Sequence, residues 1–174
     1  MSKQKSLWRG VLAGIGGGLA AAWMMNKFMA GPGQELQQAV QSDEEKHEQE
    51  AHGDELKEDA TMKAAEDIVQ TTTGRHLSGS EKEKASPIVH YAFGALTGGL
   101  YGGLAEYSSV VTSGFGTSFG GLLFNTADFL AVPALNLAPS PMNQPASAQA
   151  SPFAARIVYG VTAELVRRTL RMLL

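Results

Sequence analysis

Four apolar segments, separated by polar stretches, dominate the pattern of residues along this chain of 174 residues. They cover residues 7–30, 88–111, 116–135 and 153–174. A helix that crosses a bilayer needs about 20 mostly apolar residues at a rise of about 1.5 Å each, and each segment is about this long. The pattern therefore predicts an all-α, polytopic membrane protein with about four transmembrane helices.

The first and last of these segments each allow a second interpretation. A basic start followed by an apolar core also fits a signal peptide, but the residues before Ala30 make a poor cleavage site, so we favour a membrane anchor. Segment 153–174 contains Glu164 and four arginines, a composition that also fits an amphipathic helix lying at the membrane interface. We expect this segment to cross the membrane, because four spans place both basic chain ends on one side.

A polar insert, residues 31–87, lies between the first two apolar segments. It carries fourteen acidic and six basic residues, a net charge of −8, whereas the rest of the chain has a net charge of +5. Its helix-forming and turn residues predict a helical, partly disordered segment outside the membrane. The chain thus divides into a transmembrane helix in 1–30, the insert, and a three-helix membrane region in 88–174.

Basic residues gather beside both chain ends, and such residues stay on the cytoplasmic side of a membrane. We therefore expect a multi-pass protein of the cell inner (plasma) membrane with both termini in the cytoplasm. The acidic insert would then face the exterior, or the periplasm of a bacterium with two membranes. The basic residues are Lys3, Lys5, Arg9, Arg167, Arg168 and Arg171.

Glycines recur at four-residue spacing in three of the apolar segments. Such rows remove side chains from one helix face and let two backbones approach closely, which is how helices pack in lipid. In a water-soluble helix each glycine costs about 1 kcal/mol relative to alanine, so the rows favour a membrane location. The predicted packing glycines are Gly10, Gly14, Gly18, Gly94, Gly98, Gly99, Gly102, Gly103, Gly116 and Gly120.

Three acidic residues fall inside apolar segments, although a carboxylate within a membrane span is costly. Counting about 1.5 Å per residue places Glu106 and Glu164 at similar depths near the cytoplasmic face. We expect an inner polar layer in which Arg167 or Arg168 joins them. Asp128 lies nearer the opposite face and predicts an outer layer, with the partners Arg156 and either His90 or Asn125.

These polar layers support three interpretations, one of which is a site for a lipid head group, a pigment or an unknown ligand. Paired charges can fix the register of neighbouring helices, which we favour because each carboxylate has an arginine near its own depth. Alternatively, carboxylates at different depths can pass protons or ions across the membrane.

Other kinds of chemistry have little support in the sequence. The absence of cysteine excludes disulfides and thiolate ligands, and no basic stripe with interleaved aromatic residues indicates nucleic-acid binding. We find no catalytic group of residues and expect no metal and no cofactor. The tyrosines of the apolar segments, Tyr101 and Tyr159 among them, are interpreted as packing or interfacial aromatics.

The sequence therefore predicts a non-enzymatic accessory or assembly subunit. It would pack through its glycine faces against other membrane-protein subunits or against further copies of itself, within the lipid bilayer. The alternative function is a small transporter or a proton or ion channel that uses the intramembrane carboxylates.

Several stretches resemble a known family. They read KEDATMKAAED, PIVHYAFGALTGGLYGGLAEY, GFGTSFGGLLFNTADFLAVPALNL and ARIVYGVTAELVRR. Together they resemble the YagU-like family of bacterial inner-membrane proteins, most densely over residues 59–168. The resemblance implies a polytopic membrane protein but no chemistry, since the function of that family is unknown. Its recognisable positions are His90, Glu106, Asp128, Pro133, Glu164, Arg167 and Arg168.

Overall fold

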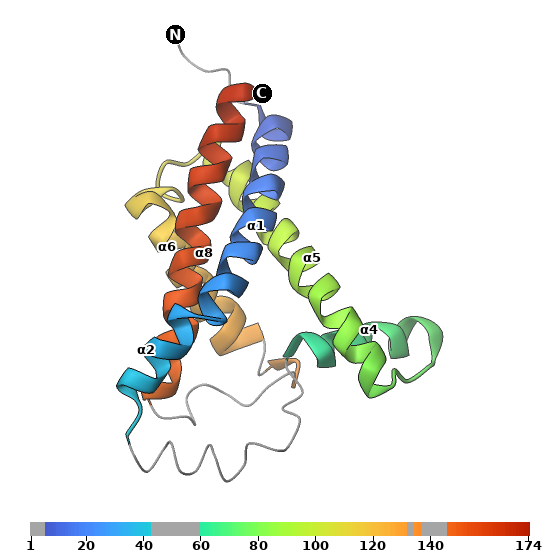
Figure 1. Cartoon of the computed structure of the whole chain (residues 1–174). Coiled ribbons are helices and arrows are strands. Elements are labelled where there is room, and N and C mark those ends of the chain that lie inside the picture. The colour runs from blue at the N-terminus through green and yellow to red at the C-terminus, as the bar shows by residue number, and fades with distance from the viewer. Residues whose placement is uncertain (1–5, 43–59, 132–133, 137–145) are drawn as a thin grey trace.

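The computed structural model describes residues 6–42, 60–131, 134–136 and 146–174 (Figure 1). The side chains of residues 128–131 and 146 lie outside this description. The described residues form helices and no strand, which confirms the all-α prediction. The elements are α1 (Leu7–Met29), α2 (Pro32–Val40), α4 (Ala60–Thr73), α5 (Gly79–Ala105), the 3₁₀ turn η1 (Ser113–Gly116), α6 (Thr117–Leu123), the π-helix η2 (Phe124–Ala131) and α8 (Ala146–Leu173).

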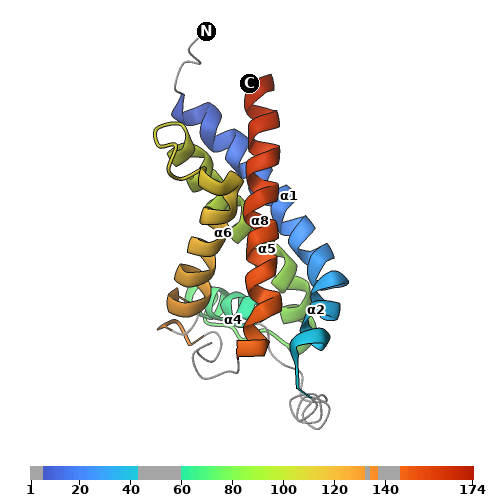
Figure 2. The same cartoon turned by 90° about the vertical axis from the view of Figure 1, so that its left-hand side faces the viewer.

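Three long helices, α1, α5 and α8, make the bundle, and α1 packs against both of the others (Figure 1). The helix α6 covers another side of α8, as the turned view shows (Figure 2). The start of α1 and the end of α8 lie at one end of the bundle, while α2 and α4 lie toward the opposite end. The described parts of the acidic insert are therefore remote from the basic end of α8.

The helix bounds depart from the predicted segments at several points. The helix α5, which contains most of the predicted segment 88–111, begins earlier, at Gly79. Pro87 therefore lies inside this helix. The segment 116–135 is divided into η1, α6 and η2, and α8 begins at Ala146, seven residues before the predicted start. Within the described ranges, no helix is both long and apolar enough on average to cross a membrane.

The early start of α5 has a local cause. Glu81, three residues after Ser78, accepts hydrogen bonds from the Ser78 N–H and from the Ser78 hydroxyl, each at 2.8 Å. With the contact between the Ser78 side chain and the Glu81 N–H, the pair makes the capping box that begins many helices. The helix α4 is fastened alongside, because the Thr61 and Ser86 hydroxyls meet at 2.5 Å and Glu66 accepts from the Leu77 N–H at 2.9 Å.

The contact between α1 and α5 is made by backbone against backbone. A Cβ atom added to Gly14 would lie 2.8 Å from the Cα of Gly102, and one added to Gly98 would lie 2.6 Å from the Cα of Gly18. Real Cβ atoms do not approach so closely, so only glycine permits this helix separation. The neighbouring Gly99 and Gly103 also face α1, against its aliphatic side chains.

Glycines also allow close contact with α8. A Cβ on Gly17 would lie 2.6 Å from the carbonyl oxygen of Ala163. On the other side of α8, a Cβ on Gly120 would lie 2.9 Å from the carbonyl carbon of Arg156. All ten glycines singled out from the sequence therefore face helices of their own chain.

Replacing Gly98 by alanine should destabilise the bundle. The added methyl group meets the α1 backbone, which has no flexible side chain to move, and overpacking of this kind costs about 1–3 kcal/mol. Gly121→Ala is the matched control, because nothing lies within 4 Å of a Cβ at that position. Thermal unfolding of the purified protein should show a lower Tm for Gly98→Ala alone. Equal Tm values for the two variants would contradict the close approach.

The cap of α5 should respond to acid. Hydrogen bonds from the Ser78 N–H, the Ser78 hydroxyl and Arg75 lower the pKa of Glu81 from 4.5 to about 2. Because the folded pKa is depressed, the stabilisation is present above about pH 4.5 and is lost as the pH falls through 2. The carboxyl carbon signal of Glu81 in an NMR titration should thus have its midpoint near pH 2. Ser78→Ala should move that midpoint upward, and an unchanged midpoint would exclude the Ser78 hydroxyl as a cause.

Candidate functional site

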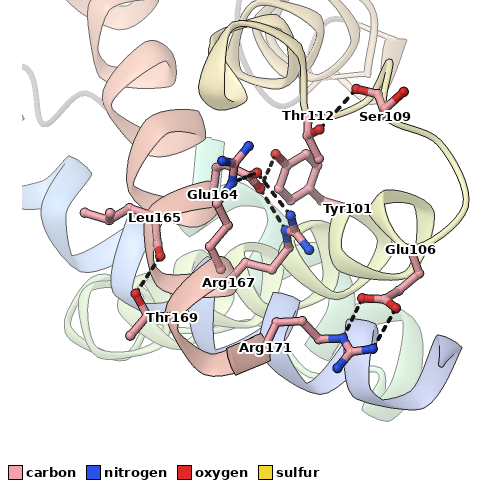
Figure 3. Close-up of polar contacts among 10 residues, drawn as sticks. Tyr101, Glu106, Ser109, Thr112, Glu164, Leu165, Arg167, Thr169 and Arg171 are labelled. Atoms are coloured by element: carbon pink, nitrogen blue, oxygen red, sulfur yellow. Dashed lines mark hydrogen bonds and ion pairs between the residues drawn. The ribbon is translucent and has the colours of Figure 1, made fainter. Parts of the chain in front are cut away.

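The carboxylate of Glu164 is the centre of a buried polar cluster on α8 and is 0% exposed. Arg167 donates to it from Nε at 2.7 Å and from Nη2 at 3.0 Å, while Arg168 donates from Nε at 2.5 Å. The hydroxyl of Tyr101, which comes from α5, donates at 2.7 Å (Figure 3). Two cations and one phenol therefore share a single carboxylate between two helices.

A second cluster joins three helix ends. Arg171 holds Glu106 in a bidentate pair, with Nε at 2.7 Å from Oε1 and Nη2 at 3.0 Å from Oε2 (Figure 3). The same carboxylate accepts the N–H of Ser6 at 3.2 Å. Glu106 follows the last residue of α5, Ser6 precedes the first residue of α1, and Arg171 lies in the last turn of α8. One carboxylate thus fixes the position of all three long helices.

The inner polar layer differs from its prediction in one pairing. Glu164 does pair with Arg167 and Arg168, but the partner of Glu106 is Arg171. Arg171 lies four residues beyond Arg167, and therefore on the same face of α8 one turn nearer the helix end. That turn brings Arg171 level with the end of α5, so the ion pair of Glu106 is made by Arg171, which the predicted layer did not include.

The outer layer is only partly described. Nη1 of Arg156 lies 3.8 Å from the sulfur of Met25, and Nε2 of His90 lies 3.4 Å from the carbonyl oxygen of Ala22. Asn125 is exposed and donates to a carbonyl one turn back in its own helix, at 2.9 Å. Asp128 belongs to η2, but its side chain lies outside the described residues, so its predicted partners stay a prediction.

Two tyrosines have a polar role that the sequence interpretation missed. Tyr159 is 2% exposed, and its hydroxyl donates to the carbonyl oxygen of Gly94 at 2.7 Å and meets the hydroxyl of Thr97 at 2.9 Å. The ring of Phe119 stacks on that of Tyr101, with centroids 4.3 Å apart, and lies 6.3 Å from that of Tyr159. A buried phenol needs a hydrogen-bond partner, so tyrosines in two apolar segments were a usable signal for a link between α5 and α8.

The chemistry of the site is that of closed ion pairs. Among the described side chains, no buried nitrogen or oxygen lacks a hydrogen-bond partner. The described residues also contain no group of three or more His, Asp or Glu side chains that would hold a metal ion. Glu164 and Glu106 therefore serve to join helices in this arrangement.

Double-mutant cycles should separate the two clusters. Glu164→Gln with Arg167→Gln should show a coupling free energy of about 1–3 kcal/mol, as residues of one network do. Glu106→Gln with Arg171→Gln should behave alike. Glu164→Gln with Arg171→Gln should show a smaller coupling free energy, because the hydrogen-bonded ion pairs join Glu164 to Arg167 and Arg168, and Arg171 to Glu106. Strong coupling in the last cycle, measured by reversible unfolding, would contradict the assignment of partners.

Comparison with known proteins gives a family but no activity. No curated protein and no solved structure matches this sequence. A family model described as "Protein of unknown function (DUF1440)" matches residues 62–165, which is more than half of the chain. The matched range begins in α4 and includes Tyr101, Glu106 and Glu164. The chain belongs to this family of proteins of unknown function, DUF1440.

Proposed function

We propose that this protein is an integral membrane protein without catalytic activity, which acts as an accessory or assembly subunit by packing against other membrane proteins or copies of itself. The observation that carries the proposal is an inverted distribution of side chains. Among the side chains that the structure describes, seven of the eleven buried apolar ones are alanines, and Glu164, Arg167 and Arg171 are buried as well. Many leucine, tryptophan and phenylalanine side chains are exposed instead.

The outward face of α5 shows the inversion most clearly. Leu96, Leu100 and Leu104 are 63%, 62% and 57% exposed, whereas Gly98 and Gly102 on the opposite face are buried against α1. In water such a row would be an apolar patch of the kind that marks an interaction surface. In a bilayer it would contact acyl chains. The mean hydropathy of the whole helix combines this leucine face with the less apolar glycine face.

The ends of α1 fit the same proposal. Trp8 is 68% exposed near its start and Trp23 is 51% exposed near its end, with the Lys27 ammonium 6.0 Å from the ring of Trp23. Tryptophan and lysine are typical of membrane–water interfaces. Ionisable groups within a membrane face the bundle interior and pair with one another, as Glu164 and Arg167 do. These features support a bilayer location for α1, α5, the α6–η2 segment and α8.

The proposed topology keeps both termini in the cytoplasm of a bacterial inner membrane and the acidic insert outside. The position of α2 and α4, toward the end of the bundle remote from the C-terminal end of α8, supports it (Figure 1). For α8 we propose a membrane span in preference to an interfacial helix, since its buried residues extend from Ser151 to Arg171. The resemblance to the YagU-like inner-membrane family points the same way.

A subunit role requires a surface that is not used within the bundle. The glycine rows are occupied by helices of the same chain, so we assign the contact with a partner to the leucine row Leu96, Leu100 and Leu104. The closed pairs of Glu106 and Glu164 favour this packing role over the alternative, a transporter or proton channel, because conduction would require these pairs to open.

Membrane association and assembly can be tested on one preparation. Washing membranes at alkaline pH should leave the protein in the pellet, and native mass spectrometry in mild detergent should show a complex heavier than the monomer. The combined substitutions Leu96→Ala, Leu100→Ala and Leu104→Ala should dissociate the complex. Leu19→Ala, at an exposed position on α1, is the control and should not. Release by the alkaline wash would exclude the membrane location, and a wild-type monomer without a partner would exclude the subunit role.

A further inference from the structure

The two polar clusters at the basic end of the bundle have unequal numbers of acids and bases. Arg171 pairs with Glu106, whereas Arg167 and Arg168 both pair with the single carboxylate of Glu164. The side chain of Arg167 is 9% exposed and that of Arg168 is 50% exposed. The surplus positive charge of the Glu164 cluster therefore lies on a guanidinium that solvent or a lipid head group can reach.

Arg168 is held in position by two contacts. Its Nε donates to Glu164 at 2.5 Å, and its guanidinium carbon lies 4.7 Å from the centroid of the Phe115 ring. Within the described residues no other hydrogen bond involves its side chain, whereas a guanidinium has five N–H donors. The donors of its two terminal nitrogens thus remain for a ligand, on a group that is already oriented.

Phe115, whose ring lies against the Arg168 guanidinium, has an unfavourable backbone conformation. Gly114, Phe115 and Gly116 have φ values of 59°, 55° and 87°. Glycine adopts such angles readily, but an L-residue such as phenylalanine does so at a cost in free energy. Left-handed residues that are not glycine persist where the surrounding structure holds them, and they often lie at functional sites. In this protein the strained turn places an aromatic ring, itself 40% exposed, against the guanidinium.

Among the described side chains at this end of the bundle, the exposed charged groups are positive. Glu164, on α8, and Glu106, at the end of α5, are the described acids here, and their side chains are 0% and 8% exposed. Arg9, on the first turn of α1, is exposed together with its neighbour Trp8. Arginine beside an exposed aromatic ring is suited to the head-group level of a membrane, where the ligands at hand are phosphates.

We propose that Arg168, supported by Phe115 and Glu164, binds a phosphate group, and that an anionic phospholipid head group supplies it. Two terminal guanidinium nitrogens match two phosphate oxygens in a bidentate contact. The net charge of the Glu164 cluster then falls to zero when the anion binds. This inference rests on the membrane location proposed above. Free phosphate in solution offers the same chemistry, and only a position at the membrane makes the lipid head group the ligand at hand.

Thermal unfolding in detergent with added ligands tests the site. Phosphatidylglycerol should raise the Tm of the wild type more than phosphatidylcholine does, and Arg168→Gln should lose at least half of that difference. Arg75→Gln is the matched control, because Arg75 is also an exposed arginine paired with a glutamate, Glu81, but lies in the α4–α5 turn. It should keep the full difference. Phe115→Gly relieves the strained backbone while removing the ring, and it should also reduce the difference, which covers the case in which Arg168→Gln does not fold.

The site would be overturned if the two lipids shifted the Tm of the wild type equally. It would also be overturned if Arg168→Gln and Phe115→Gly kept the full difference in Tm shift between the lipids. Inorganic phosphate alone, added without lipid, distinguishes the sources: a shift that depends on Arg168 and equals that of phosphatidylglycerol would overturn the lipid as the ligand. Retention in alkaline-washed membranes is measured separately. If the washed membranes retain the protein but its Tm shift is the same with both lipids, only the Arg168 site is excluded. If the wash releases the protein, the membrane location is excluded as well.

Discussion

The rest of the structure depends on the direct backbone contact between α1 and α5. Gly14 and Gly18 on one helix meet Gly98 and Gly102 on the other so closely that a single methyl group would not fit. Such contacts gain van der Waals energy over a long interface without a large side chain. The crossing also sets the ends of the helices, because the Cβ of any larger residue at Gly10 would lie 2.6 Å from the Gly102 carbonyl oxygen and would collide with the Glu106 side chain.

A bundle closed in this way leaves little interior space for large apolar side chains. Most of the described leucines and both tryptophans therefore lie outside, and the described interior contains mainly alanines, Leu123, Phe124, the Tyr101–Phe119–Tyr159 ring column and the two arginine–glutamate clusters. A buried ion pair adds little net stability, because desolvation offsets its attraction, but breaking one partner is costly. We therefore interpret Glu106 and Glu164 as residues that specify which helix ends meet. Fold and proposed location are thus two consequences of the same arrangement.

Features that depend on residue spacing within one helix can be predicted from the sequence. Contacts that depend on how two helices are rotated relative to one another cannot. The glycine rows were readable because four-residue spacing defines a helix face by itself, and the structure places all ten of these glycines against other helices. The pairing of Glu106 with Arg171 was missed because depth along a helix does not say which turn of α8 faces α5. The start of α5 was missed although Ser78 and Glu81 form a recognisable capping pair. The π-helical turn η2 had no sequence signal that we could interpret.

In the proposed arrangement, the outward leucine face of α5 lies at the depth of the acyl chains, against lipid or an apolar partner, while its glycine face is closed against α1. Because the chain contains no cysteine, a spin label on Leu100→Cys in liposomes reports on this face alone. In the proposed arrangement the label should collide more often with oxygen, which dissolves in lipid, than with a water-soluble nickel complex. A label on Ser80→Cys, in the polar first turn of α5, should show the reverse. Greater access of the nickel complex at residue 100 would contradict the claim.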